Sequence, residues 1–177
     1  MASEDRLELM ALQSESQPGQ TTVRANRFVL QDTSGRTRAV LAVDKLGPGL
    51  AFYDESGRPS LIVGIKSDGP GLALYGSDGR IRAILSLDND GPGLIFKDGD
   101  GEIRVGLSLD KDGPALGLQS ADRKARVIML VSKDGPAVTL YGENGKPNAV
   151  LDVDKGGPGL GLFDNLGKQV ASVPPQA

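Results

Sequence analysis

The chain has 177 residues, 23 acidic and 20 basic side chains, a net charge of −3, and neither Cys nor His. The lack of Cys excludes disulfides, thiolate metal sites and a Cys nucleophile, and the lack of His removes the commonest general base and transition-metal ligand. The small and evenly mixed charge is unlike the basic surface of nucleic-acid-binding proteins, so we expect no nucleic-acid partner.

Residues 1–22 differ from the rest of the chain. Leu7, Met10 and Leu12 form a loose apolar stripe, which predicts a short helix that caps the following repeats or assists assembly. Such a short helix is marginal alone, so a frayed terminus is the alternative. The segment lacks the apolar core of a secretory signal, and no run approaches the ~18 apolar residues of a membrane helix. We therefore expect no membrane span, and a cytoplasmic protein by default or part of an exported or virion-like assembly.

Residues 23–173 form a tandem repeat. Gly-Pro recurs every 22 residues, at Gly47-Pro48, Gly69-Pro70, Gly91-Pro92, Gly113-Pro114, Gly135-Pro136 and Gly157-Pro158. Seven copies of the unit Gly-Pro-Gly-Leu-x-Leu-Tyr-Asp-x-x-Gly-Lys/Arg-x-Arg-Ala-x-Leu-x-Val-Asp-Lys-Asp fit this segment, and a fixed period of this size indicates a repeat architecture. Residues 174–177 contain two prolines, cannot continue a strand, and are expected to form a disordered tail.

Each unit contains two strand-like runs. In the run Ala83 to Leu87, residues Ala83, Leu85 and Leu87 alternate with Ile84 and Ser86, which is the period of a strand and not of a helix. One face of the resulting sheet is strongly aliphatic. The other carries small and β-branched residues, which suits either close approach by another sheet or subunit, or exposure to solvent.

Two kinds of turn separate the runs. Asp78-Gly79 and Asn144-Gly145 are hairpin signals, because Gly accepts a positive φ without cost. In the Asp-Gly-Pro-Gly segments, Pro and the Gly after it match the two central positions of a type II turn. Both junctions therefore predict tight reversals of the chain.

The sequence predicts an all-β fold of seven repeats with two short strands each. Tight reversals favour β-hairpins that continue as an elongated spiral or meander, and a β-solenoid is the alternative. A barrel of so many strands would be too wide for side chains to fill, so the apolar face of a meander must be buried elsewhere. Copies of the same chain are the simplest cover, and we expect a homo-oligomer, with a trimer as the specific prediction.

The unit at Gly69 to Arg80 resembles bacterial repeat proteins built from tandem Gly-Pro-Gly-Leu-x-Leu-Tyr-Asp-x-x-Gly-Lys units, a resemblance that implies a repetitive β fold and no activity. The Tyr-Asp-x-x-Gly-Arg segment at Tyr53 to Arg58 is similar to the YD repeats of Rhs-type toxins and teneurins. The Gly-Pro-Gly element and the 22-residue period depart from that pattern, so the hairpin shell of that group is not carried over. Trimeric β-spirals of viral fibre shafts offer a structural analogy only.

Acidic turns are the candidate metal sites. Carboxylates at alternate positions before a glycine could supply oxygen ligands to Ca²⁺. The candidates are Asp88, Asp90, Asp98, Asp100, Asp110 and Asp112. No copy completes a calcium loop, and Lys45 and Lys111 stand in equivalent turns, so the alternative is that Asp, Asn and Gly simply form turns.

Two further series recur. Arg38, Arg82, Arg104 and Arg126 share strands with Asp44, Asp88, Asp110 and Asp154, which predicts cross-strand or cross-subunit ion pairs, or an anion-binding stripe. Tyr53, Tyr75, Tyr141 and Phe163 occupy one repeat position, which indicates packing at a strand end or a platform for sugars or bases. Lys97 and Gln119 interrupt this series.

No catalytic constellation, P-loop or dinucleotide fingerprint is present in the sequence, and we expect no enzyme and no cofactor. A uniform repeat without a unique site predicts a structural, self-associating protein: a fibre, stalk, spacer or scaffold subunit, alone or in a larger assembly. The alternative is a multivalent module that binds carbohydrate, Ca²⁺ or a protein partner.

Overall fold

The computed structural model describes residues 22–122 and 125–173, and every helix or strand in these ranges is a β-strand. The strands are β1 (Arg27–Gln31), β2 (Thr37–Asp44), β3 (Gly47–Tyr53), β4 (Pro59–Lys66), β5 (Gly69–Tyr75), β6 (Ile81–Asp88), β7 (Gly91–Lys97), β8 (Ile103–Asp110), β9 (Gly113–Gln119), β10 (Ala125–Ser132), β11 (Gly135–Tyr141), β12 (Pro147–Asp154), β13 (Gly157–Phe163) and β14 (Gln169–Val173). The all-β prediction is confirmed. The predicted N-terminal helix and C-terminal tail lie outside the described residues.

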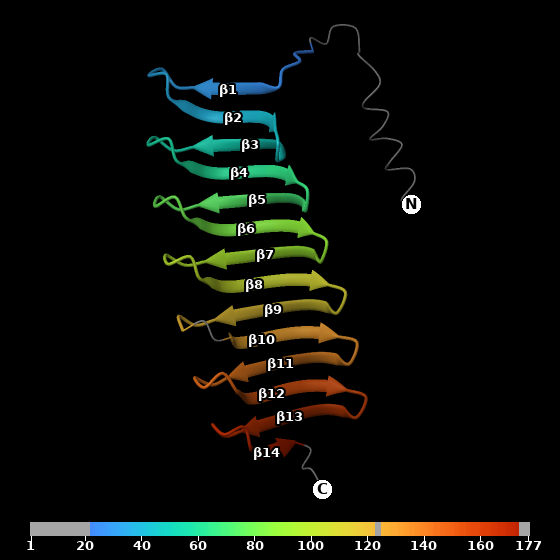
Figure 1. Ribbon diagram of the computed structural model, residues 1–177. Helices are drawn as coiled ribbons and strands as arrows, with labels where there is room; N and C mark the ends of the chain where they lie inside the picture. Colours follow the sequence, from blue (N-terminus) through green and yellow to red (C-terminus); the bar gives the residue numbers. More distant parts are fainter. Residues whose placement is uncertain (1–21, 123–124, 174–177) are drawn as a thin grey trace, which may run out of the picture.

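The strands form one open sheet in which each strand is hydrogen-bonded to its sequence neighbours, in the order β1 to β14. Every pairing is antiparallel, and β1 and β14 lie at opposite ends of the ladder (Figure 1). The hairpin meander is therefore confirmed and the solenoid alternative is wrong. Tight reversals join neighbouring strands edge to edge, whereas a solenoid would have needed the two strands of a unit in facing sheets.

The sheet twists little for its length. Adjacent strands ordinarily rotate by roughly 20–25°, which over so many strands would turn the far end well past half a circle. Figure 1 shows β1 and β13 running in nearly the same direction. Untwisted sheets of many strands are generally stabilised by stacking on another layer or by ladders of matching side chains. The strict repeat supplies such ladders along this sheet.

The loops that join each odd-numbered strand to the next even-numbered one, called Asp loops here, all lie on one side of the ladder. In residues 54–58 the amide of Asp54 donates to the carbonyl of Arg58 at 2.8 Å, and the amide of Gly57 donates to the carbonyl of Asp54 at 3.1 Å. Gly57 has a φ of 77°, and the register shifts between Phe52 and Tyr53. This is a three-residue hairpin loop with a glycine in the left-handed region and an adjoining bulge.

The Gly-Pro turns lie on the opposite side and correct the predicted turn geometry. Asp88 pairs with Gly91, so the loop consists of Asn89 and Asp90 alone. Gly91, which precedes the proline, has the positive φ of 127°, while Pro92 and Gly93 already belong to β7. The type II prediction placed the centre of the turn at Pro92 and Gly93, three residues too late. The fixed φ of proline is compatible with the start of a strand, where its missing amide hydrogen breaks no ladder bond.

We predict that Gly91→Ala destabilises the fold by about 1–3 kcal/mol, because alanine is strained at this φ. An added Cβ would also lie 2.0 Å from the carbonyl oxygen of Leu109 in β8, which is a severe clash. Urea denaturation monitored by circular dichroism measures the change.

The matched control is Gly106→Ala in the middle of β8, where an added Cβ meets no atom within 4 Å. This variant is expected to be neutral or more stable by up to about 1 kcal/mol, since Gly weakens a strand relative to Ala. Equal losses in both variants would contradict the role assigned to the Gly-Pro turn.

Candidate functional site

One face of the sheet, called the aliphatic face here, consists of three parallel rows of apolar side chains. The central row contains Phe28, Leu41, Leu50, Val63, Leu72, Leu85, Leu94, Leu107, Leu116, Met129, Val138, Leu151, Leu160 and Val173. The loop-side row contains Ala39, Phe52, Leu61, Leu74, Ala83, Phe96, Val105, Leu118, Val127, Leu140, Ala149 and Leu162, and the proline row contains Val43, Pro48, Ile65, Pro70, Leu87, Pro92, Leu109, Pro114, Val131, Pro136, Val153 and Pro158. The antiparallel register places equivalent residues of all repeats side by side.

Most of the aliphatic face is open in the part of the chain that the structure describes. Leu41, Leu85 and Leu151 in the central row are 50%, 51% and 53% exposed. Among the described residues only Ala39, Val40 and Ala83 are buried, and no large side chain is completely enclosed. These residues therefore form a sheet with almost no hydrophobic core.

The second face is better sheltered by its own side chains. Val40, on this face of β2, is 9% exposed, whereas its neighbour Leu41 on the aliphatic face is 50% exposed. Val40 lies in a shallow hollow lined also by Arg27, Thr37 and Tyr53. The sequence left open whether this face packs against another sheet or subunit or faces solvent. Its small and apolar residues are already sheltered by long polar and aromatic side chains of the same chain, which favours a face turned to solvent.

A row of small residues also runs along the second face, where Gly49 and Gly64 lie opposite each other, as do Gly71 and Ser86. The side chains of larger neighbours fold over parts of this row. An added Cβ at Gly161 would lie 2.9 Å from the ring of Phe163, and one at Gly159 would lie 2.7 Å from the carboxylate of Asp152. Small residues here leave room for side chains from the same or the neighbouring repeat.

The Asp loops contain the best-organised polar groups. The carboxylate of Asp54 accepts hydrogen bonds from the amides of Ser56 at 2.8 Å and Arg58 at 2.9 Å. Asp32 and Asp164 accept the equivalent pairs of bonds in their loops, as does Asp98. Where Gly76 replaces the first aspartate, Asp78 two residues later accepts from the Arg80 amide. Each loop thus satisfies its own backbone donors.

These bonds favour the ionised carboxylates. The pKa of Asp32 falls from its ordinary value of 3.8 to about 2, mainly through the hydrogen bond from the Ser34 hydroxyl. Hydrogen bonds donated by the backbone amides of Arg58 and Arg80 lower the pKa of Asp54 and Asp78. For Asp98, partial desolvation raises the pKa, but bonds from the Glu102 amide and the Arg104 side chain together lower it by more.

Within the chain the recurrent arginines pair with aspartates of the adjoining loops, and not across strands. Arg82 pairs with Asp78 at 2.7 Å and Arg126 with Asp122 at 2.9 Å, and Arg104 and Arg38 likewise pair with Asp98 and Asp32 of their loops. Asp44, Asp88, Asp110 and Asp154 stand at the far ends of the same strands, ~20 Å from the arginines. A shared strand separated these charges, and the adjoining loop supplied the partner. The sequence signal for it is an aspartate four or six residues before each arginine.

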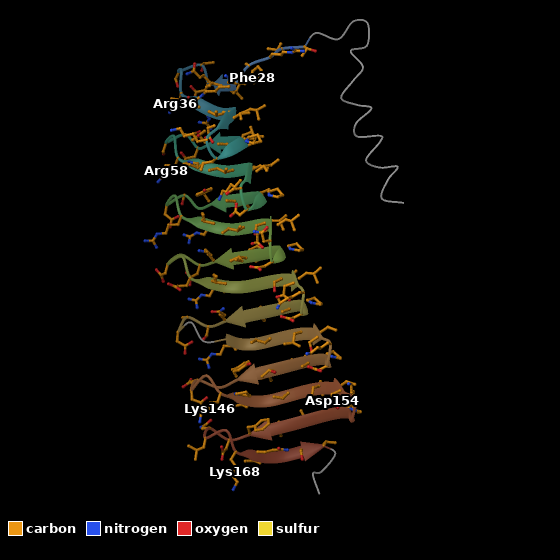
Figure 2. All side chains as sticks on the ribbon, turned by 45° about the vertical axis from the view of Figure 1, so that its right-hand side comes forward. Phe28, Arg36, Arg58, Lys146, Asp154 and Lys168 are labelled. Carbon is orange, nitrogen blue, oxygen red and sulfur yellow. The ribbon has the colours of Figure 1, made fainter. Side chains whose placement is uncertain are left out.

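Other basic side chains connect one repeat to the next. The Arg80 guanidinium donates to the carbonyl of Gly99 at 2.8 Å, and the Lys146 ammonium donates to the carbonyl of Leu166 at 2.9 Å. Arg36 makes the same kind of contact with Glu55 at 3.4 Å. Figure 2 shows Arg36, Arg58, Lys146 and Lys168 along the loop side of the sheet and Asp154 on the other side. This cation-to-carbonyl ladder was not predicted from the sequence.

The structure divides the calcium candidates between the two sides. Asp88, Asp90, Asp110 and Asp112 lie in or beside Gly-Pro turns, whereas Asp98 and Asp100 lie in an Asp loop. The carboxylates of Asp88 and Asp110 accept hydrogen bonds from the backbone amides of Asp90 and Asp112, which is the bond that a turn-forming aspartate makes. The described part of the chain contains no group of three or more acidic side chains placed to hold a metal ion.

The aromatic series lies at the loop ends of the odd-numbered strands, on the second face. Tyr53, Tyr75 and Tyr141 are each the last residue of a strand, and Phe163 ends β13. Lys97 and Gln119 occupy this position in β7 and β9. The interrupted row favours packing at strand ends over a continuous stacking platform.

No protein-family model and no curated protein matches the sequence. The described residues include no helix of the length and apolarity needed to cross a membrane. The feature that distinguishes this surface is therefore its own geometry: a continuous aliphatic face, bordered by Asp loops on one side and Gly-Pro turns on the other.

The lowered pKa values of Asp32, Asp54, Asp78 and Asp98 predict acid sensitivity. Their folded-state pKa values lie below the unfolded value of 3.8, so ionised loops stabilise the fold above that pH. The contribution is lost as pH falls through the folded values, down to about 2 for Asp32. The melting temperature should stay level from pH 7 to 5 and decline between pH 4 and 2.

Asp54→Asn should reduce this decline, since the amide oxygen still accepts the loop hydrogen bonds but does not titrate in this range. Asp100→Asn is the control, because Asp100 contributes its backbone amide to the loop as a donor to Asp98, and the substitution leaves that amide in place. A melting temperature that fell as steeply in Asp54→Asn as in the parent chain would refute the assignment.

Proposed function

We propose that this chain is a non-catalytic structural protein that acts by self-association through its aliphatic face, as a homo-oligomer of three copies. The observation that carries the proposal is the continuity of that face over all repeats, with its large side chains about half exposed. Fibre, stalk, spacer and scaffold subunit are the roles that an elongated sheet of this kind suits, alone or within a larger assembly.

The apolar area is of the size found in stable interfaces. More than twenty large apolar side chains on the aliphatic face are over a third exposed. At roughly 50 Å² of apolar surface for each half-exposed side chain, they offer on the order of 1,000 Å². The largest apolar patch of a typical monomer is about 300–600 Å², and a standard protein interface buries about 800 Å² per partner. Copies of the same chain have the matching length and surface.

The equivalence of the repeats supports a structural role over a catalytic one. The described Asp loops repeat one kind of contact, in which an aspartate or asparagine oxygen accepts amides of its own loop, so their charged residues have closely similar environments. An active site ordinarily depends on a charged group whose environment differs from those of its equivalents. A multivalent binding module is the weaker candidate, because the aromatic row is interrupted and the acidic turns bind their own amides.

The mass in solution tests the proposal. Light scattering of the purified full chain should give a multiple of 18.4 kDa, with three copies expected. Leu107→Asp should lower the mass towards that of one chain, because it places a charge in the central row without disturbing a buried contact of the monomer. A parent chain that stays monomeric at millimolar concentration would refute self-association.

Ser108→Asp is the matched control, since Ser108 is the next residue of β8 and its side chain lies on the second face. It should leave the mass unchanged. Circular dichroism of both variants checks that the β-sheet content is retained.

A further inference from the structure

The width of the aliphatic face limits how copies can enclose it. The strands of full length have seven or eight residues, and each carries three apolar residues on this face. At ~3.4 Å per residue the sheet is ~25 Å wide, with the two flanking rows ~7 Å from the central row. Three rows therefore occupy the middle of each strand, and the loops and turns lie beyond them.

Three such sheets fit together as a triangular prism. If each side of the prism is ~35 Å wide, with the ~25 Å strands in its middle and the loops and turns at the corners, the central axis lies ~10 Å from every sheet. Each flanking row is then ~9 Å from the neighbouring sheet, close to the ordinary spacing of ~10 Å between packed sheets. The strands together with their turns thus allow each flanking row to pack against the neighbouring sheet.

The flanking rows are complementary in size. In the loop-side row most odd-numbered strands carry the larger residue of a pair, as with Phe96 in β7 beside Ala83 in β6, whereas Leu61 in β4 and Leu74 in β5 are equal in size. In the proline row the odd-numbered strands carry Pro92 and its equivalents, and the even-numbered strands carry Leu87 and its equivalents. When copies are parallel and in register, Phe96 of one copy meets Pro92 of the next, and Ala83 meets Leu87. Large residues then face smaller ones at these levels.

The charges on the two sides of the sheet favour the parallel arrangement. The Gly-Pro side carries an acid immediately before the turn glycine at Asp68, Asp90, Asp112 and Asp134, and the loop side carries a base immediately after the loop glycine at Arg36, Arg58, Arg80, Lys146 and Lys168. Arg36 and Arg58 remain 59% and 47% exposed. Both sides also carry charges of the other sign, since Lys45, Lys111, Lys133 and Lys155 lie in Gly-Pro turns and Arg36 and Arg58 pair with Asp32 and Asp54 of their own loops. Parallel copies around an axis bring the turn aspartates of one sheet to the partly exposed loop bases of the next, whereas antiparallel copies bring like sides together.

We propose that three copies assemble parallel and in register into a triangular prism, with the loop-side row of each copy packed against the proline row of its neighbour. This inference rests on the proposed self-association. The aliphatic faces line the interior, the second faces form the exterior, and each corner joins the Asp loops of one copy to the Gly-Pro turns of the next. The occupant of the aliphatic face is thus two further copies of this chain.

Crosslinking at the corners tests this arrangement without background, because the chain has no native Cys. The double variant Arg58→Cys, Asp68→Cys places thiols just beyond the two ends of β4. Within one copy they are more than ~25 Å apart, out of reach of a short bis-maleimide. In the prism, each Cys at position 58 lies at the same corner as the Cys at position 68 of the neighbouring copy.

The double variant should give a covalent trimer on denaturing gels, and either single variant should give no crosslinked product. Crosslinking of a single variant would show that like sides meet, and a product that stops at the dimer would show a two-sheet sandwich; either overturns the prism. A second control, Ile62→Cys with Lys66→Cys, places both thiols on the second face of β4 and should not crosslink.

Light scattering of the untreated double variant separates the two proposals. A trimeric mass with no covalent trimer overturns the corner geometry and leaves self-association standing. A monomeric mass in both the parent chain and the variant overturns both.

Discussion

The fold depends on the antiparallel backbone ladder, because little else in a single copy is buried. Each repeat returns the chain to the same point after two strands and two turns, so equivalent residues fall into straight rows across the sheet. In most domains of this size a hydrophobic core provides the main stabilisation. Here the ladder, the loops and the turns define the shape, and the apolar side chains are left facing outward.

The two kinds of turn make this ladder possible. On one side, an aspartate accepts the free amides of its own loop and positions an arginine of the adjoining strand. On the other, a glycine with positive φ permits the reversal, and the proline after it begins the next strand. Both turns are closed by contacts a few residues apart along the chain. The geometry of one repeat is therefore independent of how many repeats follow.

The sequence allowed the strands, their alternation and the hairpin topology to be predicted, because period-two patterning and turn-forming residues are local signals. It located the Gly-Pro reversal three residues too late, since proline suits both a turn and the start of a strand. For the recurrent arginines it predicted cross-strand or cross-subunit ion pairs, and within the chain their partners are loop aspartates. Asp88 and Arg82 share a strand, but a strand holds its ends apart, and the loop brings Asp78 to Arg82.

The sequence by itself determined that the chain is a repeat of short strands with one aliphatic face, since the spacing of Gly-Pro and the alternation of side chains require no tertiary information. Only the tertiary structure decided that the strands form a single open sheet, that the second face is sheltered by its own side chains, and that no other described segment covers the aliphatic face. Both a solenoid and a meander satisfy the same local pattern. They differ in which strands share hydrogen bonds, and that depends on the path of the backbone through each turn.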